Sequence, residues 1–314
     1  MARGRRRLDL HRLDLQGAAT YGGYRMAALA ARGLPGFAAQ QLAPAIGLGA
    51  AFASPERRAM ITRHLRRAAP TLGGVRLRRS VQEAFDSYTR YWLESFRLPH
   101  LSAGAVERGM NIDGYHHVTA ALDQGNGVIL ALPHLGGWEW AGRRMVDLGH
   151  GLTVVVEEVE PPELFEWFTD LRRDLGMNVV PLGPSAAREV VAALKRNDIV
   201  CLLCDRDIHR SGVEVEFFGE RTTVPAGPAT LALRTGAPLL PTAVYFTDRT
   251  DGHLGVVRPP ISLVRSGDGM RADAARVSQD LVVELEHLIR RAPQQWHLFQ
   301  PNWPSDPGYE RRPG

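Results

Sequence analysis

The sequence feature that most constrains the fold is an alternation of short apolar runs with longer amphipathic segments, which begins near residue 115. Runs of this kind, bounded by glycine, proline or polar residues, are typical of buried strands, and the segments between them have helical periodicity. The expected strands are 127–132, 152–157, 177–181, 198–204, 238–246 and 253–257. The expected helices are 115–124, 138–148, 161–175, 185–195, 227–235 and 273–291. This alternation predicts an α/β fold with a largely parallel central sheet flanked by helices.

The amino-terminal part of the chain has a different pattern. Segments 18–32, 55–69 and 80–97 show helical periodicity, and we expect no strand among them. We therefore expect residues 1–114 to form an added helical layer and residues 115–314 to form the α/β core. A chain of 314 residues can bury a core of this size as one compact unit.

The charge of the chain is distributed unevenly. Its net charge is +4, but residues 1–80 contain fifteen arginines and three acidic residues, a net charge of +12, so the remainder carries −8. Arginines mixed with Ala, Leu, Phe and Tyr are typical of helices at an anionic lipid surface, although a solvated basic face has the same composition. We do not expect a nucleic acid partner, because the stretch lacks aromatic interleaving and any recognised binding motif. The amino-terminal layer is thus expected to face an anionic membrane surface.

No segment is expected to span a bilayer. The longest apolar candidate, Leu42–Ala53, is interrupted by Pro44, Gly47 and Gly49 and is shorter than the roughly 18 residues that a span needs. It also begins too far along the chain to belong to a signal peptide. We expect an uncleaved protein that is peripheral to the cytoplasmic face of the inner membrane.

The cysteines and histidines do not indicate a metal site. Cys201 and Cys204 form a Cys-x-x-Cys on an expected buried strand, without a second pair for zinc, which favours buried thiols over redox or metal chemistry. His134 has no second histidine at ligand spacing, and His116 and His117 lie on a separate expected helix. We therefore expect neither a metal nor a cofactor.

The chemistry is indicated by the segment Gly127–Glu139, in which a histidine follows an apolar strand and a carboxylate comes five residues later. On one helix, His134 and Glu139 would point about 140° apart. Gly136 and Gly137 permit a sharp turn, so that the histidine can meet a carboxylate in the first turn of the next helix. Such a pair leaves one imidazole nitrogen free to take a proton from an alcohol. His134 is the expected general base and Glu139 its partner; the alternatives are a turn histidine bonded to backbone and an acid that complements the helix dipole.

This spacing resembles the His-x-x-x-x-Asp/Glu motif of the glycerolipid and lipid A acyltransferase superfamily. Three further blocks, Leu171–Gly183, Leu203–Asp207 and Val215–Ala229, resemble that superfamily in the expected order. The chain also resembles the phosphatidylinositol mannoside acyltransferase branch of actinobacteria, which shares the stretches Tyr88–Trp92 and Trp296–Trp303.

The resemblance implies roles for further charged residues. Arg172 matches the family arginine, which would bind phosphate or stabilise negative charge, and Arg173 takes its place if the helix register differs. Glu157 would orient the histidine or bind acceptor hydroxyls, unless it is a solvated strand end. Asp205 and Arg206 match the acidic-Arg pair of the third block, with a structural ion pair as the alternative. Glu157 and Asp205, like the histidine, follow expected strands, and ligands collect at this edge of a parallel sheet.

The resemblance further implies transfer of a long-chain acyl group from acyl-coenzyme A to a mannosyl hydroxyl of a phosphatidylinositol mannoside, a glycolipid acceptor. The alternatives are another lipid acceptor, lipid A-like or a lysophospholipid, and a non-catalytic lipid-binding role. No serine lies in a Gly-x-Ser-x-Gly elbow, so we expect direct attack by the acceptor, with N–H groups near Gly136 and Gly137 holding the oxyanion. An apolar groove for the acyl chain would be lined from among Trp138, Trp140, Phe165, Trp167, Phe168, Phe217 and Phe218.

Overall fold

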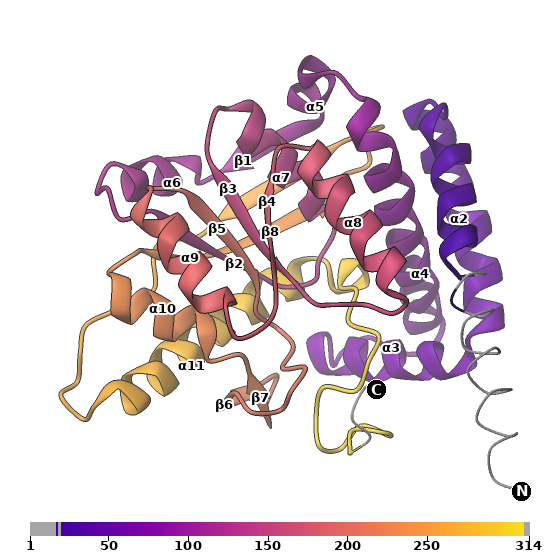
Figure 1. Ribbon diagram of the computed structural model, residues 1–314. Coiled ribbons are helices and arrows are strands. Elements are labelled where there is room, and N and C mark those ends of the chain that lie inside the picture. The colour runs from indigo at the N-terminus through magenta and orange to yellow at the C-terminus, as the bar shows by residue number, and fades with distance from the viewer. Residues whose placement is uncertain (1–16, 18–19, 311–314) are drawn as a thin grey trace, which may run out of the picture.

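A seven-stranded sheet lies at the centre of the protein, in a computed structural model that describes residue 17 and residues 20–310 (Figure 1). The strand order is β1-β9-β8-β2-β5-β3-β4, and all neighbours are parallel except β8 and β9. The strands are β1 (Met110–Asp113), β2 (Val128–Leu132), β3 (Leu152–Val156), β4 (Asn178–Pro181), β5 (Ile199–Leu203), β8 (Leu239–Phe246) and β9 (His253–Val257). A separate antiparallel hairpin consists of β6 (Val213–Phe217) and β7 (Glu220–Val224). The predicted α/β class and largely parallel sheet are confirmed.

Helices cover both faces of this sheet, and the first ones form a layer at one end (Figure 1). After helical residues 20–32 they are α2 (Gly36–Ala53), α3 (Pro55–Ala68), α4 (Gly74–Arg97), α5 (Ala103–Gly109), α6 (Tyr115–Leu122), α7 (Trp138–Asp147), α8 (Pro162–Asp174), α9 (Ala186–Lys195), α10 (Gly227–Thr235) and α11 (Met270–Arg291). No helix among the residues with a described structure is long and apolar enough to cross a membrane.

Strand β2 shows why its sequence is apolar throughout. All five residues are buried, because the strand is central and both faces of the sheet are covered. Ile129 and Ala131 pack into the core cluster that includes residues of α9, α10 and α11, whereas Val128 and Leu130 pack into the cluster that includes residues of α5, α6 and α7. A strand with two buried faces is fixed in place, and so is the loop at its end.

The amino-terminal layer packs around α4. Helix α2 runs along α4 on the side away from the sheet, and α3 crosses near the start of α4 (Figure 1). Phe85 of α4 packs with Leu65 of α3 and with Phe299 near the carboxyl terminus. The layer is therefore joined to the rest of the protein through apolar contacts made by α4 and by the last segment of the chain.

Several elements differ from the sequence prediction. The interrupted apolar segment Leu42–Ala53 belongs to helix α2, which forms despite Pro44, because its small residues Ala39, Ala43 and Gly47 allow close packing on α4. Helix α4 begins at Gly74 rather than at residue 80. Helix α5, strand β1 and the β6–β7 hairpin were not predicted, since each is too short to show a clear period. Strand β1 joins the main sheet ahead of residue 115, and the proposed division of the chain at that residue stays a prediction.

Candidate active site

The site is built at the carboxyl ends of the neighbouring strands β2 and β5. Their register pairs Leu132 with Leu203, so the residues two positions after each strand, His134 and Asp205, lie side by side. His134 Nδ1 is 2.7 Å from Asp205 Oδ1, and the backbone N–H of His134 donates to Asp205 Oδ2 at 3.0 Å. The carboxylate thus holds both the ring and the main chain of the histidine.

Asp205 is fully buried and remains an acceptor. Trp296 Nε1 donates to its Oδ2 at 2.7 Å. Burial by itself would raise the pKa of Asp205, but the charge of the imidazole and the hydrogen bonds from His134 and Trp296 outweigh burial and hold that pKa below its usual range. With Nδ1 donating to this carboxylate, Nε2 of His134 has a lone pair that can accept a proton. The histidine side chain is 27% exposed, so a substrate can reach it.

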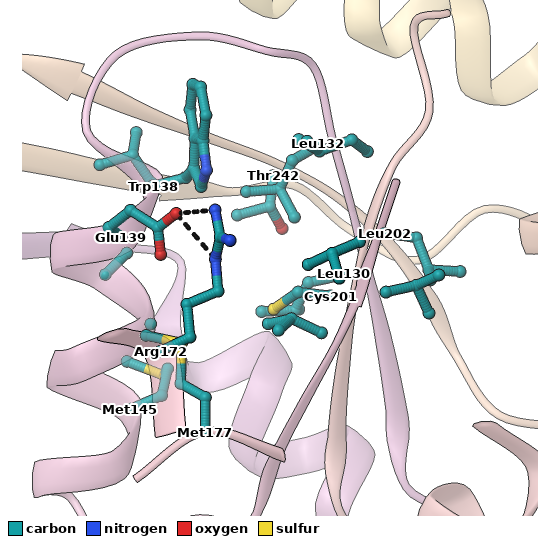
Figure 2. Close-up of a pocket in the computed structure, with 17 residues that line it drawn as sticks. Leu130, Leu132, Trp138, Glu139, Met145, Arg172, Met177, Cys201, Leu202 and Thr242 are labelled. Atoms are coloured by element: carbon teal, nitrogen blue, oxygen red, sulfur yellow. Dashed lines mark hydrogen bonds and ion pairs between the residues drawn. The ribbon is translucent and has the colours of Figure 1, made fainter. Parts of the chain in front are cut away.

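Glu139, the expected partner of His134, has other partners in the structure. Its Oε1 accepts from Arg172 Nε at 3.0 Å and Nη2 at 2.5 Å, and from the hydroxyl of Tyr91 at 3.1 Å. Figure 2 shows this ion pair between the first turn of α7 and the side chain from α8. The expectation that Glu139 is the partner of His134 is wrong. The partner of His134 is Asp205, because β5 brings this buried carboxylate directly beside the turn that follows β2.

Of the two neighbouring arginines, Arg172 points inward. Burial lowers the pKa of its guanidinium, but the adjacent Glu139 outweighs burial, and the net pKa is raised. Arg173 lies on the surface, where it pairs with exposed Asp170 at 3.1 Å. The α8 register therefore places Arg172, and not Arg173, beside the other predicted site residues.

The remaining predicted residues lie on the same edge of the sheet. Arg206 Nη1 is 3.5 Å from Glu157 Oε2, and both side chains line cavities that also include His134. Asp205 and Arg206 do not pair with one another, because the carboxylate is directed to His134 and the guanidinium to Glu157. The structural ion pair considered as an alternative for these two neighbours is therefore not formed.

His134 lies where two cavities meet. The first, called here the aromatic cavity, has a volume of about 250 Å³ and lies between α4, α8 and the ends of β3 and β5. Its lining includes Tyr88, Tyr91, Trp92, Trp138, Phe165, Phe168, Arg172, Glu157 and Arg206. The second, the loop-side cavity, has a volume of about 400 Å³ and is bounded by α9, the loop 205–212 and the start of α10. Two substrates could therefore reach the imidazole from different sides.

An apolar cleft extends from the aromatic cavity between α7 and the sheet. Trp138 and Arg172 line both spaces, and the wall of the cleft continues through Leu130, Met145 and Met177 (Figure 2). Of the aromatic residues expected to line an acyl groove, Trp138, Phe165 and Phe168 face the aromatic cavity. The others pack in or against core clusters: Trp140, Trp167, Phe217 and Phe218.

The carboxyl-terminal segment holds the site together. Gln295 O accepts from Gly136 N–H at 3.0 Å, and His297 N–H donates to His134 O at 2.6 Å. Asn302 Nδ2 donates to the backbone oxygen of Asp205 at 3.1 Å. The Gly136 N–H is thus engaged and cannot hold an oxyanion as expected, whereas the N–H groups of Gly137 and Trp138 have no partner among the described residues. Sequence reasoning noted the stretch 296–303 as a family likeness but gave no role to its indole and amide groups.

The two thiols are poor candidates for chemistry. Burial raises the pKa of Cys201 to about 12, and burial with the charge of Asp205 raises the pKa of Cys204 as well. Neither forms a disulfide. The described part of the chain contains no group of three or more His, Cys, Asp or Glu residues arranged to hold a metal ion.

The chain belongs to the bacterial lipid A biosynthesis acyltransferase family, which it matches over residues 16–305. It is 41% identical over 234 residues to a phosphatidylinositol mannoside acyltransferase of Mycobacterium tuberculosis, an alignment that covers 73% of this chain and 72% of that protein. It is 39% identical over 235 residues to the protein of the same name from Mycolicibacterium smegmatis, with 74% of this chain and 75% of the relative covered. The predicted family is confirmed.

Proposed function

We propose that the protein transfers a long-chain acyl group from acyl-coenzyme A to a mannosyl hydroxyl of a phosphatidylinositol mannoside. The observation that carries the proposal is the imidazole of His134, held through Nδ1 by a buried carboxylate and open to cavities on two sides. The names of the mycobacterial relatives support the choice of acceptor.

In this mechanism Nε2 of His134 removes the proton from the acceptor hydroxyl as its oxygen attacks the thioester carbonyl. The C–O bond forms, and the tetrahedral oxyanion is held by the free N–H groups of Gly137 and Trp138 at the start of α7. The C–S bond then breaks, and the coenzyme A thiolate takes the proton from the imidazolium. Asp205 stabilises the positive imidazolium throughout and needs no proton of its own.

The side chains that line the cavities support separate binding places for the acyl chain and for the polar groups of the substrates. The apolar cleft, with Leu130, Met145 and Met177 in its wall, has a volume of about 80 Å³ and suits one part of an acyl chain. Glu157 and Arg206 offer a carboxylate and a guanidinium to hydroxyl or phosphate groups beside His134. The ion pair of Glu139 and Arg172 holds α7 against α8 and forms one wall of the cleft.

The proposed acceptor is a lipid, and so the protein would act as a peripheral protein at an anionic membrane, on the cytoplasmic face. Exposed arginines on α3 and at the start of α4 support contact with anionic headgroups. Arg67 of α3 is not available for this contact, because it pairs with Asp306 and Glu220 and lies over the ring of Trp303.

Direct transfer can be tested with the donor alone. Incubation with acyl-coenzyme A and no acceptor is expected to release free coenzyme A slowly, by hydrolysis, because burial leaves the thiols of Cys201 and Cys204 unactivated toward the acyl group. Added phosphatidylinositol mannoside should divert the acyl group into a lipid product that is identified by mass spectrometry. A burst of coenzyme A equal to the enzyme concentration, with an acylated peptide, would contradict the mechanism. Transfer to lysophospholipid but not to the mannoside would contradict the choice of acceptor.

The indole of Trp296 is expected to position the dyad. Trp296→Phe removes the N–H donor to Asp205 Oδ2, and a hydrogen bond to a charged group is worth about 1.5–3 kcal/mol, so we expect kcat to fall about 10–100-fold. Trp303→Phe is the matched control, because that indole is equally buried but donates to Phe217 O at 3.1 Å. Equal losses of kcat in the two variants, measured at equal folded fractions, would show that Trp296 has only a packing role.

A further inference from the structure

Helix α2 has an unusual distribution of side chains. Only Ala39, Ala43, Gly47 and Ala51 are buried, all of them small. The large apolar side chains point outward: Phe37 is 63%, Leu48 62% and Phe52 84% exposed. A helix on the surface of a soluble domain normally turns its large apolar residues toward the core and its charged residues toward water. Helix α2 carries no charged residue at all, and its outward face is apolar.

This apolar face continues into a groove with a basic wall. The groove has a volume of about 690 Å³ and lies between the end of α2, helix α3 and the start of α4. Leu48 and Phe52 form its apolar side, while Arg58, Arg66 and Arg78 line the other. The three arginines are exposed and form no ion pair with any residue in the described ranges. Exposed apolar groups beside unpaired cations are complementary to the acyl chains and phosphates of an anionic phospholipid surface.

We propose that the outward face of α2, together with this groove, inserts into the headgroup region of an anionic bilayer. A protein partner is less well matched, because the charged side chains that line the groove are all positive. The inference rests on the proposed function in one respect: an enzyme whose acceptor is a lipid is expected to bind the bilayer that contains this lipid.

Helix α2 lies close to the aromatic cavity, with only α4 between them. Helix α2 packs along α4, and α4 carries Tyr88 and Trp92 into the aromatic cavity (Figure 1). A bilayer bound to the outer side of α2 is then separated from the cavity by the thickness of this helical layer. Docking through α2 would therefore hold the site close to the surface that supplies its lipid acceptor.

The test uses the full chain and vesicles of phosphatidylcholine with phosphatidylinositol. The double variant Leu48→Ser and Phe52→Ser should bind these vesicles at least about tenfold more weakly in sedimentation, because two large apolar side chains no longer leave water. Val264→Ser with Val283→Ser is the matched control, since both valines are exposed, at 75% and 43%, but lie before and on α11. Circular dichroism and the melting temperature should be unchanged in both.

The charged wall is tested separately by Arg58→Glu with Arg66→Glu. Binding of the wild-type protein should fall between low and physiological salt, and this variant should lose that salt-dependent part while it keeps the apolar part. Unchanged vesicle binding by the Leu48 and Phe52 variant would overturn the proposal. The proposal would also be overturned if the wild-type protein were a dimer and the Leu48 and Phe52 variant a monomer, because the face would then join two copies of the chain.

An activity assay in detergent micelles separates this inference from the proposed function. Docking variants should transfer acyl groups to micellar acceptor at the wild-type rate, because α2 does not contact the dyad. If the wild-type protein gives no transfer in micelles or vesicles, the proposed function fails, and the vesicle-binding result still decides the role of α2.

Discussion

Replacing His134 by alanine will lower acyl transfer by about 10²–10⁴-fold while the protein stays folded. The imidazole is the expected proton acceptor for the hydroxyl, and its side chain is 27% exposed, so its removal empties little core volume. The measurement is the initial rate of coenzyme A release in the presence of acceptor, together with the melting temperature.

His287→Ala is a suitable control, because His287 is exposed on α11, away from the ends of β2 and β5. The control should keep the wild-type rate. A His134→Ala enzyme that retains more than about a tenth of wild-type activity at an unchanged melting temperature would remove the histidine from the general-base role.

The second large effect distinguishes the two carboxylates. Asp205→Asn keeps the size of the side chain but removes the charge that stabilises the imidazolium, and we expect kcat to fall about 10²–10⁴-fold. Glu139→Gln instead leaves the inward guanidinium of Arg172 without its counter-charge. Breaking a buried pair costs about 3–5 kcal/mol, so this variant should lose stability, while the folded fraction keeps kcat within about tenfold.

Urea unfolding and kinetics on the same preparations measure both effects. The reverse result, a stable Glu139→Gln enzyme with kcat reduced a thousandfold and an active Asp205→Asn enzyme, would restore Glu139 as the partner of the histidine.

The effect of pH on the dyad has a definite sign. Because the pKa of Asp205 is held below its usual range, its carboxylate stays ionised in the neutral range, and its contribution is lost only as pH falls through that lowered pKa.

Tyr91 shows that the site is built from segments that are distant in the sequence. Tyr91 of α4 donates to Glu139, and burial with the charge of that carboxylate raises the pKa of Tyr91 well above its usual value. The hydroxyl therefore remains protonated and acts as a donor. In the sequence, Tyr91 belongs to a stretch that could be noted only as a family likeness, because nothing local indicates that α4 reaches α7.

The alternation of apolar and amphipathic segments was sufficient to predict the fold class, since strand and helix periods are local properties of the chain. It also placed His134, Glu157 and Asp205 at strand ends, where parallel strands present their side chains to ligands. Short or unusual elements escaped this reasoning. Helix α2 is the clearest case, because Pro44 and three glycines argue against a helix locally, and its packing on α4 stabilises it nevertheless.

The sequence by itself determined the fold class and most of the longer elements, and it indicated His134 as the expected general base with a set of charged residues near it. Only the tertiary structure decided which carboxylate holds His134, because that depends on strand order: β2 lies beside β5 rather than beside β3, and the side chain after β5 is Asp205. The same holds for Trp296 and Asn302, which reach the dyad from the end of the chain. Strand order and the path of the last segment follow from long-range packing of the core, which local sequence patterns do not record.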